Sequence, residues 1–201
     1  MERNRIILGS LFLIIFIDVL GYGLVIPVLT PLFRDITQGI FHPDFSEYWR
    51  NVALGVLLAS FPFAQFFGAP VLGTLADKYG RRKLLLYSLV GAFVGYALFS
   101  LGIVWMLLPL LYIGRLIAGF MGGNIAITLS IISDITKSSH EKTRRFGLIG
   151  VAVALGVIIG PFFGGIFSHR EYSPLFSFAT PFVLASILSF VNIIIVYFVL
   201  P

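Results

Sequence analysis

Six stretches of this chain are apolar over about 20 residues or more, the length that an α-helix needs to cross a bilayer. Lipid offers no partner to an unpaired backbone group, so only helices and closed barrels span membranes. Barrel strands alternate apolar and polar residues, and these stretches do not. The sequence therefore predicts an all-α integral membrane protein with six transmembrane helices, over residues 6–33, 53–76, 84–104, 106–134, 146–168 and 175–200.

The composition agrees with a membrane protein. Charged residues make up 11% of the chain, against about 25% in a typical soluble domain. Such a chain cannot cover a water-exposed surface, and its main partner is predicted to be the lipid bilayer. The first apolar stretch is too long for the core of a signal peptide. The absence of cysteine excludes disulfides and thiolate metal sites.

The net charge of +5 is better explained by membrane topology than by nucleic-acid binding, because the basic residues cluster in short loops between spans. Ten of the 14 Lys and Arg residues lie at the N-terminus and in the loops after the second and fourth spans, and three lie in loops on the other side. By the positive-inside rule, both termini are predicted to be cytoplasmic in a multi-pass protein that binds no nucleic acid.

Two opposite charges lie deep in the predicted spans, Asp18 in the first and Arg115 in the fourth. At 1.5 Å per residue they are about 18 Å and about 14 Å from opposite ends of a core about 30 Å thick, so they lie at similar depth. A charge at this depth indicates a functional site. The two side chains could form a static ion pair, or Asp18 could exchange a proton; both interpretations stay open.

Further candidate cavity residues follow from the helical positions around these charges. Tyr22 shares the face of Asp18, and Tyr112 shares the face of Arg115. For Gln65, in the second span, cavity lining and interhelical hydrogen bonding are equally favoured. Asn124 lies nine residues after Arg115, about half a turn around an unbroken helix, so it is expected to face elsewhere and to serve packing more than a pathway.

The loop after the second span carries the run GTLADKYGRRK over residues 73–83. A plain basic loop needs only Lys and Arg, whereas this run also contains two glycines and an aspartate. The glycines would allow close helix approach and a tight turn, and Arg81 could pair with Asp134. The run resembles the cytoplasmic loop signature of the major facilitator superfamily. Its conformational motif would comprise Gly73, Asp77, Gly80, Arg81 and Arg82, with Asp134 at the end of the fourth span.

Three more runs resemble motifs of that family. The first span reads DVLGYGLVIPVLTP over 18–31, similar to the first-helix motif of drug/proton antiporters. RLIAG over 115–119 resembles the family's arginine-centred motif, although Ala118 stands where glutamine is common. The fifth span is similar to the antiporter glycine-proline motif through Gly156, Gly160, Pro161, Gly164 and Gly165. With Ala152, its regularly spaced glycines also form a flat stripe suited to close helix packing, and the Gly-Pro pair predicts a bend.

The resemblance implies twelve spans in two halves, each half a three-plus-three inverted repeat in which helices one and four line a central cavity. Residues 1–201 would then be the N-terminal six-helix half, without its C-terminal half, as a truncation or a natural form. Such a half would need the missing half, or a self-associated copy, to transport.

The implied function is proton-coupled efflux of a small amphipathic or cationic compound across a bacterial inner membrane, with protons and that compound as partners. An uptake symporter and a non-transporting assembly domain are the alternatives, and the glycine-proline motif argues against the symporter. An enzyme is not expected, nor a cofactor or metal, because His42, His140 and His169 all lie in loops.

Overall fold

The structure, a computed structural model, describes residues 2–35, 39–136, 138–168 and 173–200. Lys137, His169 and Arg170, which the sequence places in loops, lie outside the described residues. The described part is helical and contains no strand. Its helices are α1 (Glu2–Gly23), α2 (Val25–Arg34), α3 (Glu47–Tyr79), α4 (Arg81–Val104), α5 (Leu108–Met121), α6 (Asn124–Asp134), α7 (Ser139–Ser168) and α8 (Thr180–Val199).

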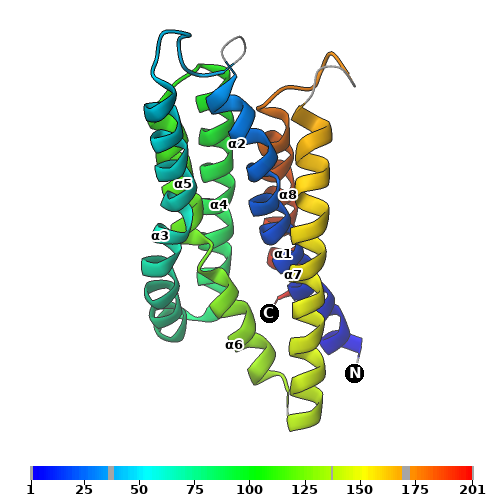
Figure 1. Cartoon of the computed structure of the whole chain (residues 1–201). Helices are drawn as coiled ribbons and strands as arrows, with labels where there is room; N and C mark the ends of the chain where they lie inside the picture. Colours follow the sequence, from blue (N-terminus) through cyan, green and yellow to red (C-terminus); the bar gives the residue numbers. More distant parts are fainter. Residues whose placement is uncertain (1, 36–38, 137, 169–172, 201) are drawn as a thin grey trace.

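Six helical segments are long and apolar enough to cross a membrane, which confirms the predicted number of transmembrane helices. The first consists of α1 with α2 and the fourth of α5 with α6, while α3, α4, α7 and α8 are the others (Figure 1). Observed and predicted bounds differ most where helices continue past the apolar core. α3 begins at Glu47 instead of 53, and α7 at Ser139 instead of 146. α8 begins only at Thr180, because residues before it form a turn in which the Ser177 amide donates to Thr180 Oγ1 (2.9 Å).

The first span is broken between Gly23 and Val25. Pro27 explains this break, since a proline ring clashes with the carbonyl four residues earlier, which here belongs to Gly23. Proline alone is not sufficient: α7 runs through Pro161 as one uninterrupted helix, and no break marks the bend predicted there.

The fourth span is broken too, although the sequence analysis treats 106–134 as one helix. Gly122 and Gly123 separate α5 from α6. The amides of Gly123 and Ala126 bond to carbonyls three residues earlier, at 3.4 and 3.2 Å, so one tight turn replaces the regular helix. The two breaks are the main departures from six continuous helices: the first is at Leu24, before Pro27, and the second is at the Gly122–Gly123 pair.

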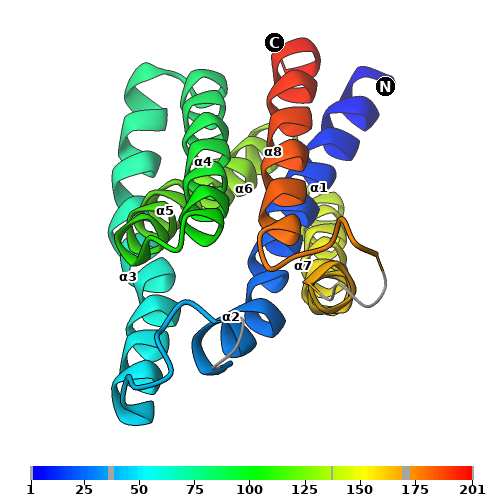
Figure 2. The ribbon, with the colours of Figure 1, turned by 90° about the horizontal axis from the view of Figure 1, so that it is seen from above.

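The helices pack in a pattern that an inverted repeat requires. The first span packs against α7 and the fourth against α3, while α4 and α8 lie side by side (Figure 2). If the first three spans are exchanged in order with the last three, the pair of the first span and α7 becomes the pair of the fourth span and α3. The pair of α4 and α8 stays the same. The first and fourth spans are therefore symmetry mates, and both are broken.

The predicted stripe on α7 is buried and packs against the broken first span. A Cβ atom at Gly156 would lie 2.9 Å from Val19, one at Gly160 would lie 2.8 Å from the Gly23 Cα atom, and one at Gly164 would lie 2.6 Å from the Leu24 carbonyl oxygen. Gly165 lies off this stripe, because a Cβ atom there would meet nothing within 4 Å. Backbone-to-backbone contact of this kind needs small residues.

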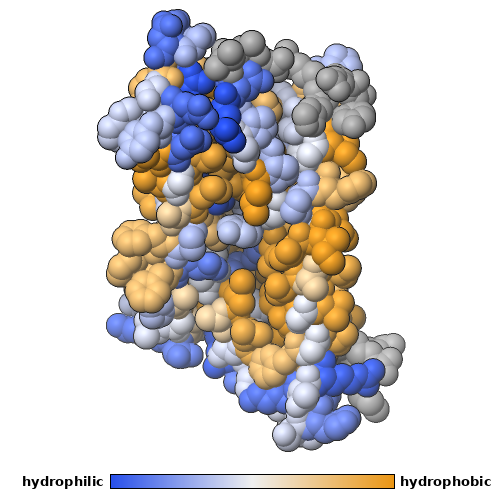
Figure 3. Space-filling model, in the orientation of Figure 1, coloured by the Kyte–Doolittle hydropathy of each residue, from blue (hydrophilic) through white to orange (hydrophobic). Residues whose placement is uncertain are grey.

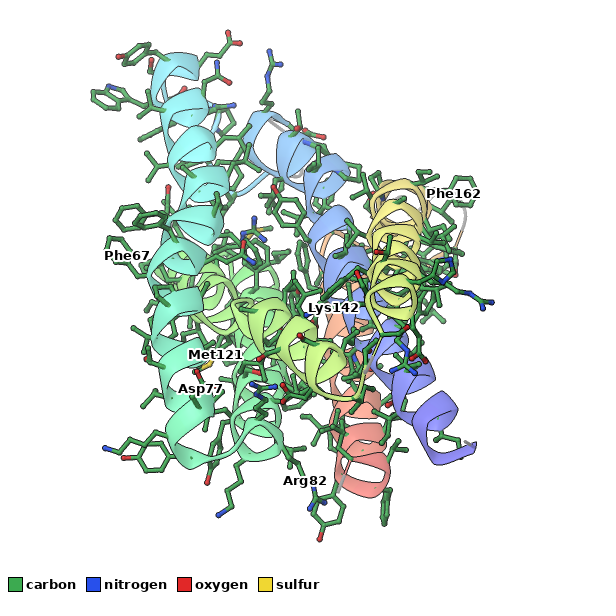
Figure 4. All side chains as sticks on the ribbon, turned by 90° about the horizontal axis from the view of Figure 1, so that it is seen from below. Phe67, Asp77, Arg82, Met121, Lys142 and Phe162 are labelled. Atoms are coloured by element: carbon green, nitrogen blue, oxygen red, sulfur yellow. The ribbon has the colours of Figure 1, made fainter. Side chains whose placement is uncertain are left out.

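Charged and apolar surfaces are separated along the bundle. On the face that Figure 3 shows, an apolar belt crosses the middle of the bundle and hydrophilic residues gather at both ends. Both chain ends lie toward the end that holds the loops between α3 and α4 and between α6 and α7 (Figure 1). Seen from that end, Asp77 lies near the end of α3 and Arg82 beside α8 (Figure 4). Arg82 donates there to the Tyr197 carbonyl at 2.6 Å, tying α4 to the last turns of α8.

Candidate functional site

A cavity of about 170 Å³ lies between the first span, α3, α4 and the break in the fourth span. Its apolar walls include Phe61, Pro62 and Ala92. Its polar lining residues are Asp18, Tyr22, Gln65, Tyr96 and Asn124. In Figure 3 hydrophilic residues are visible in a hollow midway along the apolar belt. The cavity therefore brings polar groups together at a depth where the rest of the surface is apolar.

Asp18 and Asn124 are joined by a hydrogen bond: Asn124 Nδ2 donates to Asp18 Oδ2 at 2.7 Å. The expectation that Asn124 faces elsewhere is wrong, because it assumed an unbroken helix between Arg115 and Asn124. Asn124 is the first residue of α6. Because the turn at Gly122–Gly123 separates α6 from α5, the Asn124 side chain points in a different direction from the one that an unbroken helix would give. The bond therefore links the first span to the break in the fourth span.

Arg115 does not form the ion pair with Asp18 that similar depth allows; among the described residues no such pair is found. Its guanidinium instead lies over two rings, 4.7 Å from the centre of Phe61 and 5.8 Å from that of Tyr22. Arg115 is 2% exposed, and its Nε and Nη1 atoms have no hydrogen-bond partner in the described part of the chain. Cation–π contact stabilises a cation without neutralising it.

Gln65 supports the break in the fourth span. Its Nε2 donates to the Gly122 carbonyl at 3.0 Å, and so satisfies a backbone acceptor at the break. In lipid an unsatisfied carbonyl of this kind would be costly. Of the two interpretations of Gln65, the structure therefore shows both at once, since it lines the cavity and bonds across helices.

Tyr112 does not line the cavity. Its hydroxyl donates to the Ala53 carbonyl on α3 at 2.8 Å. Sequence analysis missed two lining aromatics, Phe61 and Tyr96, because neither belongs to a motif or lies on a span that carries a buried charge. The mid-span position of Tyr96 in the third span was the available signal.

A second polar cluster lies where α3, α4 and α6 end together. Arg81 pairs with Asp134, as the sequence suggested, and its Nη2 lies 3.6 Å from Asp77 Oδ1. Gly80 has a φ of 97°, in the region that favours glycine, so it makes the expected tight turn. Gly73 serves no close approach within the described residues, because a Cβ atom there would meet nothing within 4 Å.

Arg145 fastens the end of α6 to α7. Its Nη1 donates to the Ile135 carbonyl (3.1 Å) and to Thr136 Oγ1 (3.0 Å), and its Nη2 pairs with Glu141. The segment that carries Asp134 is thus held from α4 and from α7. In the described residues no group of three His, Asp or Glu side chains is placed to hold a metal ion.

Six apolar helices, two broken spans related by an inverted repeat and a polar cavity between these spans define a multi-pass membrane protein of the transporter class. The model of the Major Facilitator Superfamily matches residues 11–201, and the chain belongs to this family.

Similar curated proteins are resistance proteins. The class H tetracycline resistance protein of Pasteurella multocida is 39% identical over 180 residues, which are 89% of this chain and 41% of that protein. The class C protein of Escherichia coli is 38% identical over 192 residues, 94% and 42% of the two chains. The quinolone resistance protein NorA of Staphylococcus aureus is 34% identical over 185 residues, 91% and 44%. The chain spans about two fifths of the length of these relatives.

Solved transporters have the same fold. The human organic anion transporter MFSD10 superposes with a TM-score of 0.75 at 26% identity, over 98% of this chain and 47% of that one. A D-xylose–proton symporter superposes with a TM-score of 0.66 at 17% identity, also over 98% and 47%. The second likeness concerns the fold alone.

Proposed function

We propose that the protein containing this chain exports a small amphipathic or cationic compound in exchange for protons, with Asp18 as the exchanging group. The observation that carries this proposal is the hydrogen bond between Asp18 and Asn124 in a cavity at the middle of the membrane. The similarity to tetracycline and quinolone resistance proteins supports efflux of an organic compound over sugar uptake.

An amide is a suitable partner for a carboxyl group that gains and loses a proton. Ionised Asp18 accepts the N–H of Asn124, as the structure has it. A protonated Asp18 needs an acceptor for its O–H, and Asn124 Oδ1 is buried without a partner among the described residues. A side-chain amide offers both a donor and an acceptor, whereas an arginine offers donors only. The pair can therefore satisfy both protonation states.

The compound would take the place of the proton. A cation close to ionised Asp18 would be favoured by its charge, and the rings of Tyr22 and Phe61 offer an apolar surface beside it. Protonation of Asp18 would remove that attraction and release the cation.

α6 provides a link from the proton to the cytoplasmic end of the bundle. Its first residue holds Asp18 and its last, Asp134, holds Arg81. We infer that a change in the Asp18–Asn124 bond tilts α6 about the glycine break and so loosens or tightens the cluster of Asp77, Arg81 and Asp134. This cluster would act as a latch on one conformation.

The membrane arrangement completes the proposal. We place the latch cluster and both termini in the cytoplasm, since basic residues gather there. The cavity side of this six-helix unit would meet a second six-helix unit, either in the same polypeptide or as a second copy. Alternating access would then move the two units about the cavity.

Transport by the complete gene product tests this function. Inverted membrane vesicles with an acidic interior should accumulate tetracycline or ethidium, and the Asp18→Asn variant, inserted at the same level, should accumulate neither. Collapse of the pH gradient should release the accumulated compound. Normal gradient-driven accumulation by Asp18→Asn would show that the proton is exchanged elsewhere, and accumulation only in right-side-out vesicles would favour the uptake symporter.

A further inference from the structure

Tyr96, on α4, is a buried phenol that the sequence motifs do not single out. It is 5% exposed and lines the cavity that holds Asp18. A buried tyrosine hydroxyl normally has a hydrogen-bond partner. That of Tyr96 has none among the described residues, so its donor and its lone pairs are free to serve groups in the cavity.

The Tyr96 hydroxyl rests against the first span one turn beyond Asp18. A Cβ atom at Gly21 would lie 2.6 Å from Tyr96 Oη and 3.0 Å from its Cζ atom. Gly21 follows Asp18 by three residues, which places both on one face of α1. The glycine therefore leaves the space into which the hydroxyl fits, next to the carboxylate.

Tyr96 also lies between two charges that do not pair with each other. It is within electrostatic reach of both Asp18 and Arg115. Arg115 has two buried nitrogen atoms, Nε and Nη1, whose N–H groups have no acceptor in the described part of the chain. A phenol has one donor and two lone pairs, so it can donate toward the carboxylate while it accepts from the guanidinium.

We propose that Tyr96 is a positioning residue of the site, whose hydroxyl bridges Asp18 and Arg115 through water in the cavity. This inference rests on the proposed exchange of a proton at Asp18. With Asp18 ionised, the hydroxyl donates toward it through a water molecule and turns its lone pairs to Arg115. With Asp18 protonated, that donation is lost. The bridge therefore stabilises the ionised state and carries the influence of Arg115 to a carboxylate that it does not touch.

Few other titratable groups face Asp18. Tyr22 lies on its own span and Arg115 on α5. α3 and α6 contribute the uncharged Gln65 and Asn124. The membrane-spanning parts of α2, α7 and α8 have no Asp, Glu, Lys, Arg or His at this depth. A change in the titration of Asp18 can therefore be assigned to a short set of neighbours.

Infrared titration of the purified complete gene product tests the bridge without any transported compound. The carboxyl band that disappears in Asp18→Asn reports the protonation of Asp18. In Tyr96→Phe its midpoint should move to higher pH by about one to two units, because the ionised form loses one hydrogen bond. Tyr87→Phe, on the same helix but 65% exposed, should leave the midpoint unchanged.

A midpoint in Tyr96→Phe that equals that of the unmodified protein would overturn the bridge and leave the proposed exchange intact. A carboxyl band of Asp18 that does not titrate at all would overturn both. The two failures are therefore distinguishable.

Gly21→Ala provides a second route to the same result, because it displaces the hydroxyl without removing it. Its midpoint should move in the same direction, by less than in Tyr96→Phe. The double variant Gly21→Ala/Tyr96→Phe should match Tyr96→Phe alone, since the added methyl group then has no hydroxyl to displace. Additive shifts would show that Gly21 acts on Asp18 by another route and would contradict the bridge.

Discussion

The first and fourth spans are symmetry mates that are both broken in mid-membrane, but for different physical reasons. Pro27 lies just after the break in the first span, where its ring crowds the Gly23 carbonyl and it has no amide to donate. Gly122 and Gly123 break the fourth, with ψ values of −7° and −5°, against about −42° in an α-helix. Glycine can cross that small difference at little cost. We therefore expect the break in the fourth span to change its geometry more readily than the break in the first.

Both breaks are packed closely by a neighbouring helix. α7 packs its glycine stripe against the backbone of the first span on both sides of the break. α3 packs as closely against the fourth span, where a Cβ atom at Gly123 would lie 2.7 Å from the Ala69 backbone, and Gln65 bonds to the Gly122 carbonyl. The two spans therefore differ in the proline of one and the glycine pair of the other, from which we infer a fixed span that carries the carboxylate and a movable span that carries its partner Asn124.

Removal of that partner should have the largest effect. Asn124→Leu removes the one side-chain hydrogen bond that Asp18 accepts among the described residues and leaves its carboxylate without a donor on the fourth span. A buried hydrogen bond to a charged group is worth about 1.5–3 kcal/mol, so gradient-driven accumulation of tetracycline should fall roughly 10- to 100-fold. Vesicle transport at equal expression measures this.

Asn192→Leu is the matched control, because Asn192 is equally buried but its amide has no partner among the described residues. It should transport normally and be at least as stable. Equal loss of transport in both variants would mean that a buried amide serves folding, not the Asp18 site.

Substitution of the packing glycines should have different effects in the two spans. A Cβ atom at Gly160 would lie 2.8 Å from the Gly23 Cα atom, and one at Gly123 would lie 2.7 Å from the Ala69 backbone. Overpacking of this kind costs about 1–3 kcal/mol, so both Gly160→Ala and Gly123→Ala should lower the thermal unfolding midpoint in detergent. Gly123→Ala should in addition lose transport at temperatures where it is folded, because it acts on the movable span.

Gly147→Ala and Gly165→Ala lie on α7 where a Cβ atom meets nothing within 4 Å. They should leave stability and transport unchanged. If Gly160→Ala and Gly123→Ala behave alike once folded, the distinction between a fixed and a movable span is wrong.

The smallest effect is expected at the far end of α6. Asp134→Asn breaks the pair with Arg81, but both groups are partly exposed, and such pairs are worth less than about 1 kcal/mol. Stability should hardly change, whereas turnover should fall several-fold with little change in binding, since the latch no longer closes fully. Glu47→Gln, which breaks the exposed Arg34–Glu47 pair at the opposite end, should alter neither quantity. Equal loss of binding and turnover in Asp134→Asn would indicate a folding defect.

Much of the fold was predictable from sequence because apolar length is a strong signal in membranes. Asp18 and Arg115 were found because a charge inside an apolar stretch is conspicuous. The role of Asn124 was not predicted. The sequence analysis assumed one continuous helix through the pair of glycines that in fact separates α5 from α6. Depth along a span could be estimated from the sequence, but the direction in which each side chain points depends on these breaks.

Tyr96 illustrates a second limit. A phenol among aliphatic and aromatic residues has no distinguishing pattern, and its importance depends on Gly21, which is 75 residues away in the chain. Likewise the partners of Arg115 are two ring faces from other spans, which no spacing rule predicts. The motif around Arg81 was easier, because its tight turn and its acidic partner both lie at helix ends.

Distances across the two breaks test the central claim that a proton on Asp18 moves the fourth span and not the first. The chain has no cysteine, so spin labels can be placed at Ile113 and Ser133 across the fourth-span break, and at Ile6 and Ile26 across the first. Pulsed electron paramagnetic resonance in lipid at acid and alkaline pH should show a changed distance for the first pair of labels and a constant distance for the second. Asp18→Asn should abolish the change. An unchanged fourth-span distance, or a change that persists in Asp18→Asn, would contradict the account.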